Sequence, residues 1–168
     1  PAEHLDTDGD LVPDHLDVFP FDPTQTTDAD GDGYGDNADG NLADAYPTDP
    51  ERHADSDGDT YDDDADDFPY DPTQWADRDG DNYGDNPVGL RPDAFPMDGT
   101  QWSDVDGDGW GDNQTGNDPD VFPTDITQWI DTDGDGYGDN PLGINPDAYP
   151  KDHTQWADLD QDGYGDNP

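Results

Sequence analysis

The sequence predicts a mostly irregular repeat array of loops and turns, with little helix or strand. Three observations lead to this fold class. A short acidic motif recurs along the whole chain of 168 residues, Gly and Pro together number 37, and only 27% of residues are hydrophobic. No stretch of useful length has the period of a helix or of a strand, and Gly and Pro interrupt every unit.

The acidic motif reads DTDGDGYGDN where it starts at Asp131. Successive starts are 22, 27, 22, 27, 27 and 27 residues apart. We number the repeats 1 to 7; repeats 1 and 3 are short, and repeats 2, 4, 5 and 6 are long because five residues are inserted after the motif. The seven repeats start at Asp6, Asp28, Asp55, Asp77, Asp104, Asp131 and Asp158. We expect one continuous array over residues 1–168, cut from a longer chain.

The second half of each repeat reads Asp, any residue, Phe or Tyr, Pro, any residue, Asp, and often Thr-Gln-Trp. Trp75, Trp102, Trp129 and Trp156 are therefore spaced by 27 residues. One interpretation is that these indoles pack on the neighbouring aromatic-Pro pairs as small apolar anchors. The alternatives are a row of sugar-stacking platforms and insertion into a membrane.

The charge balance of the chain limits the kinds of partner that it can bind. The chain has 47 acidic and four Lys or Arg residues, a net charge of −43, and nearly all of the acid is Asp. Nucleic acid and anionic membrane surfaces are not expected as partners, because no basic patch exists to meet phosphates. No apolar run is long enough to span a bilayer, and no Cys is present to form disulfides. A disordered acidic tract is the simplest alternative, but the regular spacing argues against it.

The spacing of the acids matches the ligand spacing of a calcium-binding loop. Such a loop supplies oxygens from positions 1, 3 and 5, from the position-7 carbonyl, and from positions 9 and 12, with Gly at position 6. With Asp131 at position 1, the loop is complete through position 9. Magnesium is less suited, because it tends to keep several waters. Leu11, Thr60 and Asn82 replace Gly at position 6, so those turns should be strained or differently shaped.

The candidate ligands follow from this alignment. Positions 1, 3, 5 and 9 are Asp6, Asp8, Asp10 and Asp14; Asp28, Asp30, Asp32 and Asp36; Asp55, Asp57, Asp59 and Asp63; Asp77, Asp79, Asp81 and Asp85; Asp104, Asp106, Asp108 and Asp112; Asp131, Asp133, Asp135 and Asp139; and Asp158, Asp160, Asp162 and Asp166. The carbonyl donors at position 7 are Val12, Tyr34, Tyr61, Tyr83, Trp110, Tyr137 and Tyr164.

Position 12 separates the two repeat lengths. Asp17 and Asp66 occupy it in the short repeats, whereas long repeats 4, 5 and 6 have an uncharged residue there. We infer that the insertion loops out and that an Asp five residues later returns to the metal. These later acids are Asp44, Asp93, Asp120 and Asp147; in repeat 2, Asp39 also stands at position 12, and the alignment favours Asp44.

Each repeat has more acids than one ion needs. The Asp that follows the aromatic-Pro pair is strictly placed, and two ions sharing carboxylates would use it. These residues are Asp22, Asp49, Asp71, Asp98, Asp125 and Asp152. We therefore expect about two Ca²⁺ per repeat, which would offset much of the charge without cancelling it.

The pattern resembles thrombospondin type 3 repeats, most clearly in DTDGDLVPDHLDVFPFDPTQ from Asp6 to Gln25. The resemblance covers essentially the whole chain. It implies calcium-filled repeats with little regular secondary structure, wrapped around a string of ions into an elongated, solenoid-like rod stapled by calcium. The departure is Cys: the family often has Cys-Pro where this chain has Phe-Pro or Tyr-Pro, so aromatic packing is expected to replace disulfides.

The predicted function is a calcium-binding structural repeat protein, forming a rigid extracellular or cell-surface spacer, stalk or filament. Self-association into fibres is a further possibility that the periodic aromatics raise. The alternative is a calcium-dependent adhesion module that recognises glycan or a partner protein through the Trp row. We do not expect an enzyme, because no nucleophile motif is present and metal binding would keep the acids ionised. Asn113-Gln114-Thr115 is a single N-glycosylation sequon.

Overall fold

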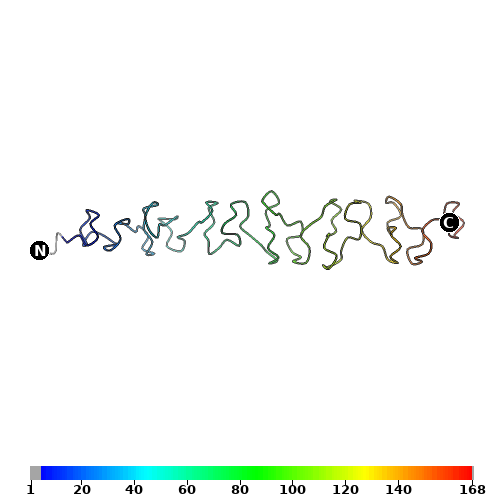
Figure 1. Ribbon diagram of the computed structural model, residues 1–168, viewed down its shortest axis with the longest axis horizontal. Helices are drawn as coiled ribbons and strands as arrows, with labels where there is room; N and C mark the ends of the chain where they lie inside the picture. Colours follow the sequence, from blue (N-terminus) through cyan, green and yellow to red (C-terminus); the bar gives the residue numbers. More distant parts are fainter. Residues whose placement is uncertain (1–4, 168) are drawn as a thin grey trace. The chain divides into compact units, whose positions relative to one another are not determined.

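A computed structural model describes residues 5–167 of the chain (Figure 1). Within this range there is no helix and no strand longer than a single bridge. The regular pairing in the described residues is limited to four isolated parallel bridges, Gly35–Ala43, Gly84–Pro92, Gly111–Pro119 and Gly138–Pro146. The prediction of a loop-rich fold with little helix or strand is confirmed.

Backbone contacts group the chain into two units, Pro1–Ala76 and Asp77–Pro168. The boundary falls between repeats 3 and 4, so the first unit holds three repeats and the second holds four. The same local construction recurs in both units, and each unit is described through its own repeats.

The interior of each repeat is polar. Among residues 5–167 no hydrophobic side chain is buried. The buried polar and charged side chains are Asp17, Gln25, Asp44, Asp62, Asp66, Gln74, Asp93, Gln101, Asp120, Gln128 and Asp147. The described repeats therefore have no core of fully buried apolar side chains, and the apolar area that they remove from water belongs to half-buried side chains such as the indoles.

The first Asp of each motif closes the acidic loop. In repeat 6, Asp131 Oδ1 accepts the N–H of Gly134 at 2.7 Å and Oδ2 accepts that of Gly136 at 2.8 Å. Asp6, Asp28, Asp55 and Asp104 make the same two bonds in their own repeats. A carboxylate with backbone donors in this pattern mimics a backbone turn, which is why Asp rather than Glu builds the loop.

The five-residue insertion of the long repeats loops out, and its two ends are held together. In repeat 2 the N–H of Gly35 donates to the carbonyl of Leu42 at 3.0 Å, and the N–H of Asp44 donates to the carbonyl of Gly35 at 2.9 Å. The four bridges lie at the four long repeats. The late Asp directly follows the bridged residue, so its side chain starts beside the acidic loop.

In repeats 2, 5 and 6, a buried glutamine binds the backbone of the insertion. Gln101 Nε2 donates to the carbonyls of Asn113 and Asn117 at 3.2 and 2.9 Å, and the N–H of Asn113 donates to Gln101 Oε1 at 2.9 Å. Gln25 and Gln128 make the equivalent three bonds in repeats 2 and 6. We call this arrangement the glutamine clamp.

The clamp explains the glycine at position 8 of the long repeats. A Cβ added to Gly111 would lie 2.2 Å from Gln101 Cδ, and one added to Gly35 would lie 2.1 Å from Gln25 Cδ. Any side chain at this position would displace the glutamine, so the glycine is required by close approach.

The periodic Trp side chains stack on the position-7 aromatics, which differs from the aromatic-Pro partners expected from the sequence. The stacked ring centroids are 5.0 to 5.9 Å apart, with planes within 9° of parallel. The pairs are Tyr61–Trp75, Tyr83–Trp102, Trp110–Trp129 and Tyr137–Trp156, and His53 takes the Trp place on Tyr34. All four indoles are half-buried. Each stack links the position-7 residue, whose backbone carbonyl is a predicted metal ligand, to the second half of the same repeat.

Position 6 keeps a left-handed backbone whether or not it is Gly. Gly33, Gly109 and Gly136 have φ between 90° and 97°, and Leu11, Thr60 and Asn82 have φ of 84°, 84° and 70°. The non-Gly repeats are therefore strained rather than differently shaped. A left-handed conformation costs an L-residue about 1–2 kcal/mol.

Replacing Thr60 by Gly is expected to stabilise the calcium-loaded protein by about 1 kcal/mol. The gain is the relief of the left-handed strain of a β-branched residue, reduced by the greater freedom of Gly in the unfolded chain. Chemical denaturation in saturating calcium measures it. Asn82→Gly is the matched control and should gain less, because Asn tolerates this conformation. A lower stability of Thr60→Gly would contradict the prediction.

Candidate metal centre

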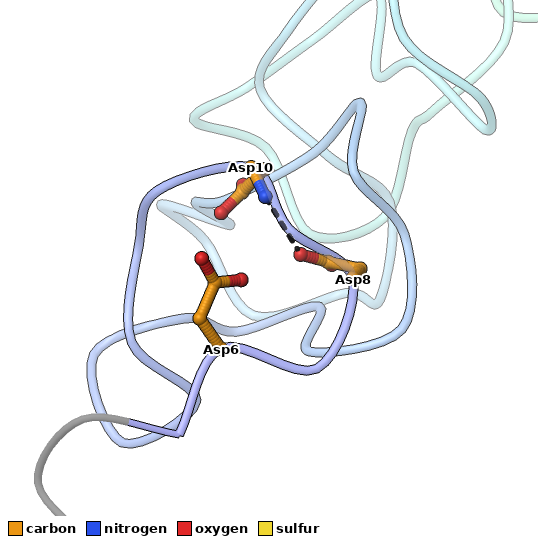
Figure 2. Close-up of side chains that lie close together, drawn as sticks. All are labelled: Asp6, Asp8 and Asp10. Atoms are coloured by element: carbon orange, nitrogen blue, oxygen red, sulfur yellow. Dashed lines mark hydrogen bonds between the residues drawn. The ribbon is translucent and has the colours of Figure 1, made fainter.

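Three carboxylates converge in the acidic loops of repeats 1 to 5. In repeat 1, Asp6, Asp8 and Asp10 each offer an oxygen, and these oxygens lie within 4.8 Å of one another (Figure 2). The corresponding triads of repeats 2 to 5 are equally close, and two further acidic groups in the described residues meet the same criterion. Positions 1, 3 and 5 of the sequence alignment are thus brought together in space.

At position 3, one carboxylate oxygen is left without a partner. Asp8 Oδ1 accepts the N–H of Asp10 at 3.3 Å, whereas Asp8 Oδ2 is buried and has no hydrogen-bond partner among the described residues. The same holds for one or both oxygens at position 3 in repeats 2 to 6: Asp30, Asp57, Asp79, Asp106 and Asp133. A buried polar oxygen without a partner costs free energy unless something outside the chain binds it.

Position 5 shows the same division of its two oxygens. Asp108 Oδ1 accepts the N–H of Trp110 at 2.8 Å, while its Oδ2 is buried without a partner. Asp59, Asp81 and Asp135 are arranged in the same way. The backbone bond to Oδ1 orients each carboxylate, so the orphaned oxygens of neighbouring positions are held in place together.

The late Asp completes the cluster. Asp120 is 0% exposed; its Oδ1 accepts the N–H of Phe122 at 2.7 Å, and its Oδ2 is buried without a partner. Burial, followed by the nearby carboxylates of Asp108 and Asp106, raises the pKa of Asp120 to about 6. An acid with this environment lies beside the acidic loop, as the alignment of the long repeats predicts.

The other long repeats place their late Asp in the same way, and the short repeats do so with the Asp at position 12. Burial and the acids of the adjoining loop raise the pKa of Asp93 to about 6 and raise the pKa values of Asp44, Asp66 and Asp147. Oδ2 is buried and unpartnered in Asp17, Asp44, Asp93 and Asp147. In repeat 2, Asp39 is exposed and Asp44 is buried, so the structure places Asp44 at the cluster.

The Asp at position 9 bonds back to the second residue of its loop. Asp14 Oδ1 accepts the N–H of Thr7, and its Oδ2 accepts the hydroxyl of Thr7, both at 2.7 Å. Asp63 makes the same pair of bonds to Ser56. In repeat 5, Asp112 Oδ1 is buried without a hydrogen-bond partner and remains able to bind a cation. In repeat 4, Asp85 Oδ2 also has no hydrogen-bond partner, but it faces Arg78 Nη2 at 3.6 Å.

The Asp after the aromatic-Pro pair is held by neutral donors. Asp98 Oδ1 accepts the N–H and hydroxyl of Thr100 at 3.1 and 2.6 Å, and the Asn117 amide donates to both of its oxygens at 3.0 and 3.2 Å. The Thr100 hydroxyl is the main cause of the lowered pKa of Asp98. None of the six described acids at this position has a buried orphaned oxygen. Their visible role is to fix a turn and, in repeats 2 and 5, the insertion.

The bases of the chain neutralise little of the charge of the clusters. The described residues contain two ion pairs, Arg52 Nε to Asp49 at 3.9 Å and Arg78 Nη2 to Asp85 at 3.6 Å. Carboxylates this close repel one another strongly when ionised. The arrangement therefore suits a cation that accepts several hard oxygen ligands.

The asparagine of the sequon makes hydrogen bonds that hold the insertion loop. Asn113 Nδ2, the atom that would carry a glycan, donates to the carbonyl of Thr100 at 2.8 Å, and Asn113 Oδ1 accepts the N–H and hydroxyl of Thr115. Asn37 and Asn140 make the same Nδ2 bond in repeats that have no sequon. The Asn at this position serves the insertion loop.

The sequence analysis did not identify the glutamine clamp, although a signal for it exists. A Gln stands three residues before the first Asp of every long repeat, namely Gln25, Gln74, Gln101 and Gln128, whereas Glu3 and Arg52 precede the two short repeats. Gly at position 8 follows the same division. The long repeats therefore have the insertion, the glutamine and the glycine at position 8, and the short repeats have none of the three.

No family model matches this chain, and no curated protein matches it. The described residues contain no helix with the length and hydrophobicity needed to cross a bilayer. The interpretation of the acidic clusters therefore depends on their own geometry and on the sequence motif.

Calcium addition at pH 6 is expected to release protons. In the ion-free fold Asp93 and Asp120 have pKa values of about 6, against about 3.9 in an unfolded chain. The folded state then binds more protons, so the ion-free protein should become more stable as the pH falls from about 7 to about 4. A pH-stat titration measures the release, and the same titration at pH 8 should release almost none. Equal release at both pH values would contradict the raised pKa values.

Proposed function

We propose that this chain is a calcium-binding structural repeat array in which bound ions, rather than an apolar core, order each repeat. The observation that carries this proposal is the set of buried, unpartnered carboxylate oxygens at positions 3 and 5 and on the late Asp. On most of these side chains the other oxygen is already fixed by a backbone N–H, and at Asp79 and Asp133 both oxygens lack a partner among the described residues. A cation is the group that satisfies such oxygens, because hydrogen-bond acceptors alone cannot satisfy one another.

Calcium is the cation that best fits the donor set. Ca²⁺ takes 6–8 oxygens in flexible geometry, and each full repeat offers carboxylates at positions 1, 3, 5, 9 and the late Asp, with a backbone carbonyl at position 7. All of these donors are hard oxygens, whereas zinc sites are usually built from Cys and His. The resemblance to thrombospondin type 3 repeats supports the same ion.

The number of ions per repeat is a separate part of the proposal. One ion in each of the six full repeats would offset about 12 units of the net charge of −43. A second ion would depend on the Asp after the aromatic-Pro pair, whose oxygens accept bonds from Thr and Asn. The clusters support one ion in each full repeat, and a measured stoichiometry near two would assign those acids to a second site.

We further propose that the array serves as an extracellular or cell-surface spacer. Loops built from Asp and backbone oxygens suit the millimolar calcium found outside cells, and each repeat is stabilised by its ion and its neighbours. The Trp side chains support a packing role, because one face of each indole is covered by a position-7 aromatic ring. We do not propose enzymatic activity.

The test is a calcium titration followed by near-ultraviolet circular dichroism, small-angle X-ray scattering and isothermal calorimetry. Calcium should order the stacked aromatics, reduce the flexibility of the chain, and bind in a number at least equal to the full repeats. Magnesium at equal concentration is the control and should produce a smaller change. The proposal is wrong if chelation leaves the aromatic signal and the scattering curve unchanged.

A further inference from the structure

Half of the Lys and Arg side chains of this protein make the same kind of contact. Of its four Lys and Arg residues, two place a guanidinium over a tyrosine ring. Arg52 Cζ lies 3.6 Å from the Tyr46 ring centroid, and Arg91 Cζ lies 4.6 Å from that of Tyr83. A cation over an aromatic face is stabilised by the ring quadrupole, and the surrounding carboxylates favour any positive charge.

Arg91 occupies part of a groove beside a stacked pair. The groove of repeat 4 has a volume of about 600 Å³ and is lined by the rings of Tyr83 and Trp102, by Arg91, and by Asp104 of the next motif. The Tyr83 ring thus contacts both the Trp102 indole and the Arg91 guanidinium. Arg91 therefore shows that the face of this tyrosine ring accepts a guanidinium group.

The same groove recurs in repeat 6 without an internal cation. It has a volume of about 330 Å³ and is lined by Tyr137, Trp156, Asn145 and Asp158, among others. Asn145 stands 14 residues after the first Asp of its repeat, as Arg91 does. Their backbones match, with φ of 46° for Asn145 and 49° for Arg91. No Lys or Arg of the described residues lies over the Tyr137 ring.

We propose that the groove of repeat 6 binds an Arg or Lys side chain of a basic peptide segment in a partner protein. The partner's cation takes the place over Tyr137 that Arg91 takes over Tyr83, and Asp158 is among the residues that line the groove. The charge of −43 attracts such a segment, and the ring face and groove select where its cation docks. This proposal goes beyond a spacer role, since it gives the second unit a docking point.

A reciprocal exchange of the two groove residues tests the proposal. The variants are Asn145→Arg, which fills the groove of repeat 6, and Arg91→Asn, which opens the groove of repeat 4. The probe is the peptide Gly-Gly-Arg-Gly-Gly, with its citrulline analogue as a neutral isostere. Indole N–H shifts of Trp102 and Trp156, assigned with Trp→Phe variants, report each groove by NMR in saturating calcium and 150 mM salt.

In the wild type the arginine peptide should shift Trp156 and leave Trp102 unchanged. Asn145→Arg should lose the Trp156 response, Arg91→Asn should gain a Trp102 response, and citrulline should bind about fivefold more weakly. Each exchange alters the net charge by one, so general attraction predicts almost no change. Wild-type behaviour of both variants, a uniform shift of all indoles, or equal binding of the citrulline peptide would each overturn the proposal. Calcium stoichiometry, measured in parallel, shows separately whether the ion sites are intact.

Discussion

Replacing Asp120 by Asn is expected to weaken calcium binding at repeat 5 by at least about 100-fold. Asp120 is completely buried, and its Oδ1 accepts the N–H of Phe122. The amide nitrogen would therefore take the place of the orphaned Oδ2 and direct N–H donors at the cation. Loss of one partner from a buried charged cluster costs about 3–5 kcal/mol, which corresponds to a factor of 100 or more. Calorimetry should detect one fewer tight site.

The same substitution should have the opposite effect without calcium. In the ion-free fold Asp120 is a buried acid beside Asp108 and Asp106, so removing its charge relieves repulsion. Asp120→Asn should therefore unfold at lower denaturant concentration than the wild type in calcium, and at higher concentration in chelator. Asp118→Asn is the matched control, because Asp118 is exposed in the same repeat and its left-handed backbone, with φ of 39°, suits Asn. Equal effects of the two substitutions would contradict the site.

Replacing Gln101 by Ala is expected to destabilise repeat 5 by about 3 kcal/mol. The substitution removes the three bonds of the clamp, each of which contributes about 0.5–1.5 kcal/mol, and leaves backbone groups of the insertion unsatisfied. Because the insertion ends beside Asp120, calcium affinity in this repeat should fall as well. Chemical denaturation and calcium titration of the variant measure the two effects.

A double-mutant cycle with Gly111 separates the clamp from general loss of packing. Gly111→Ala alone should be destabilising, because its Cβ would lie 2.2 Å from Gln101 Cδ. In the Gln101→Ala background the obstructing side chain is gone, so the added methyl should cost much less. The two substitutions should therefore show a coupling of at least about 1 kcal/mol, within the range for residues in contact. Additive effects would mean that the two side chains do not meet.

Much of the local architecture could be predicted from the sequence. The loop-rich fold follows from the density of Gly and Pro, and the acidic triads follow from the spacing of Asp6, Asp8 and Asp10. The position of Asp120 beside its loop also follows, since aligning long and short repeats leaves no other acid in register. These features depend on residues close in sequence, where turn chemistry and motif spacing are informative.

The remaining features depend on contacts between residues further apart. Gln101 meets Asn113 and Asn117 from 12 and 16 positions away, and glutamine alone has no strong structural preference that would have pointed to this role. The Trp partners were missed for a related reason. Both Phe-Pro and the position-7 rings are aromatic, so composition could not distinguish them, and only the fold shows that Trp102 stacks on Tyr83.

The polar interior has a thermodynamic consequence. The heat-capacity change of unfolding rises with newly hydrated apolar surface and falls with newly hydrated polar surface. Since the described residues bury carboxylates and amides but no hydrophobic side chain, the curvature of the free energy against temperature should be shallow. Such a protein would lose little stability on cooling, and calorimetric scans should show broad transitions with nearly equal baselines before and after melting.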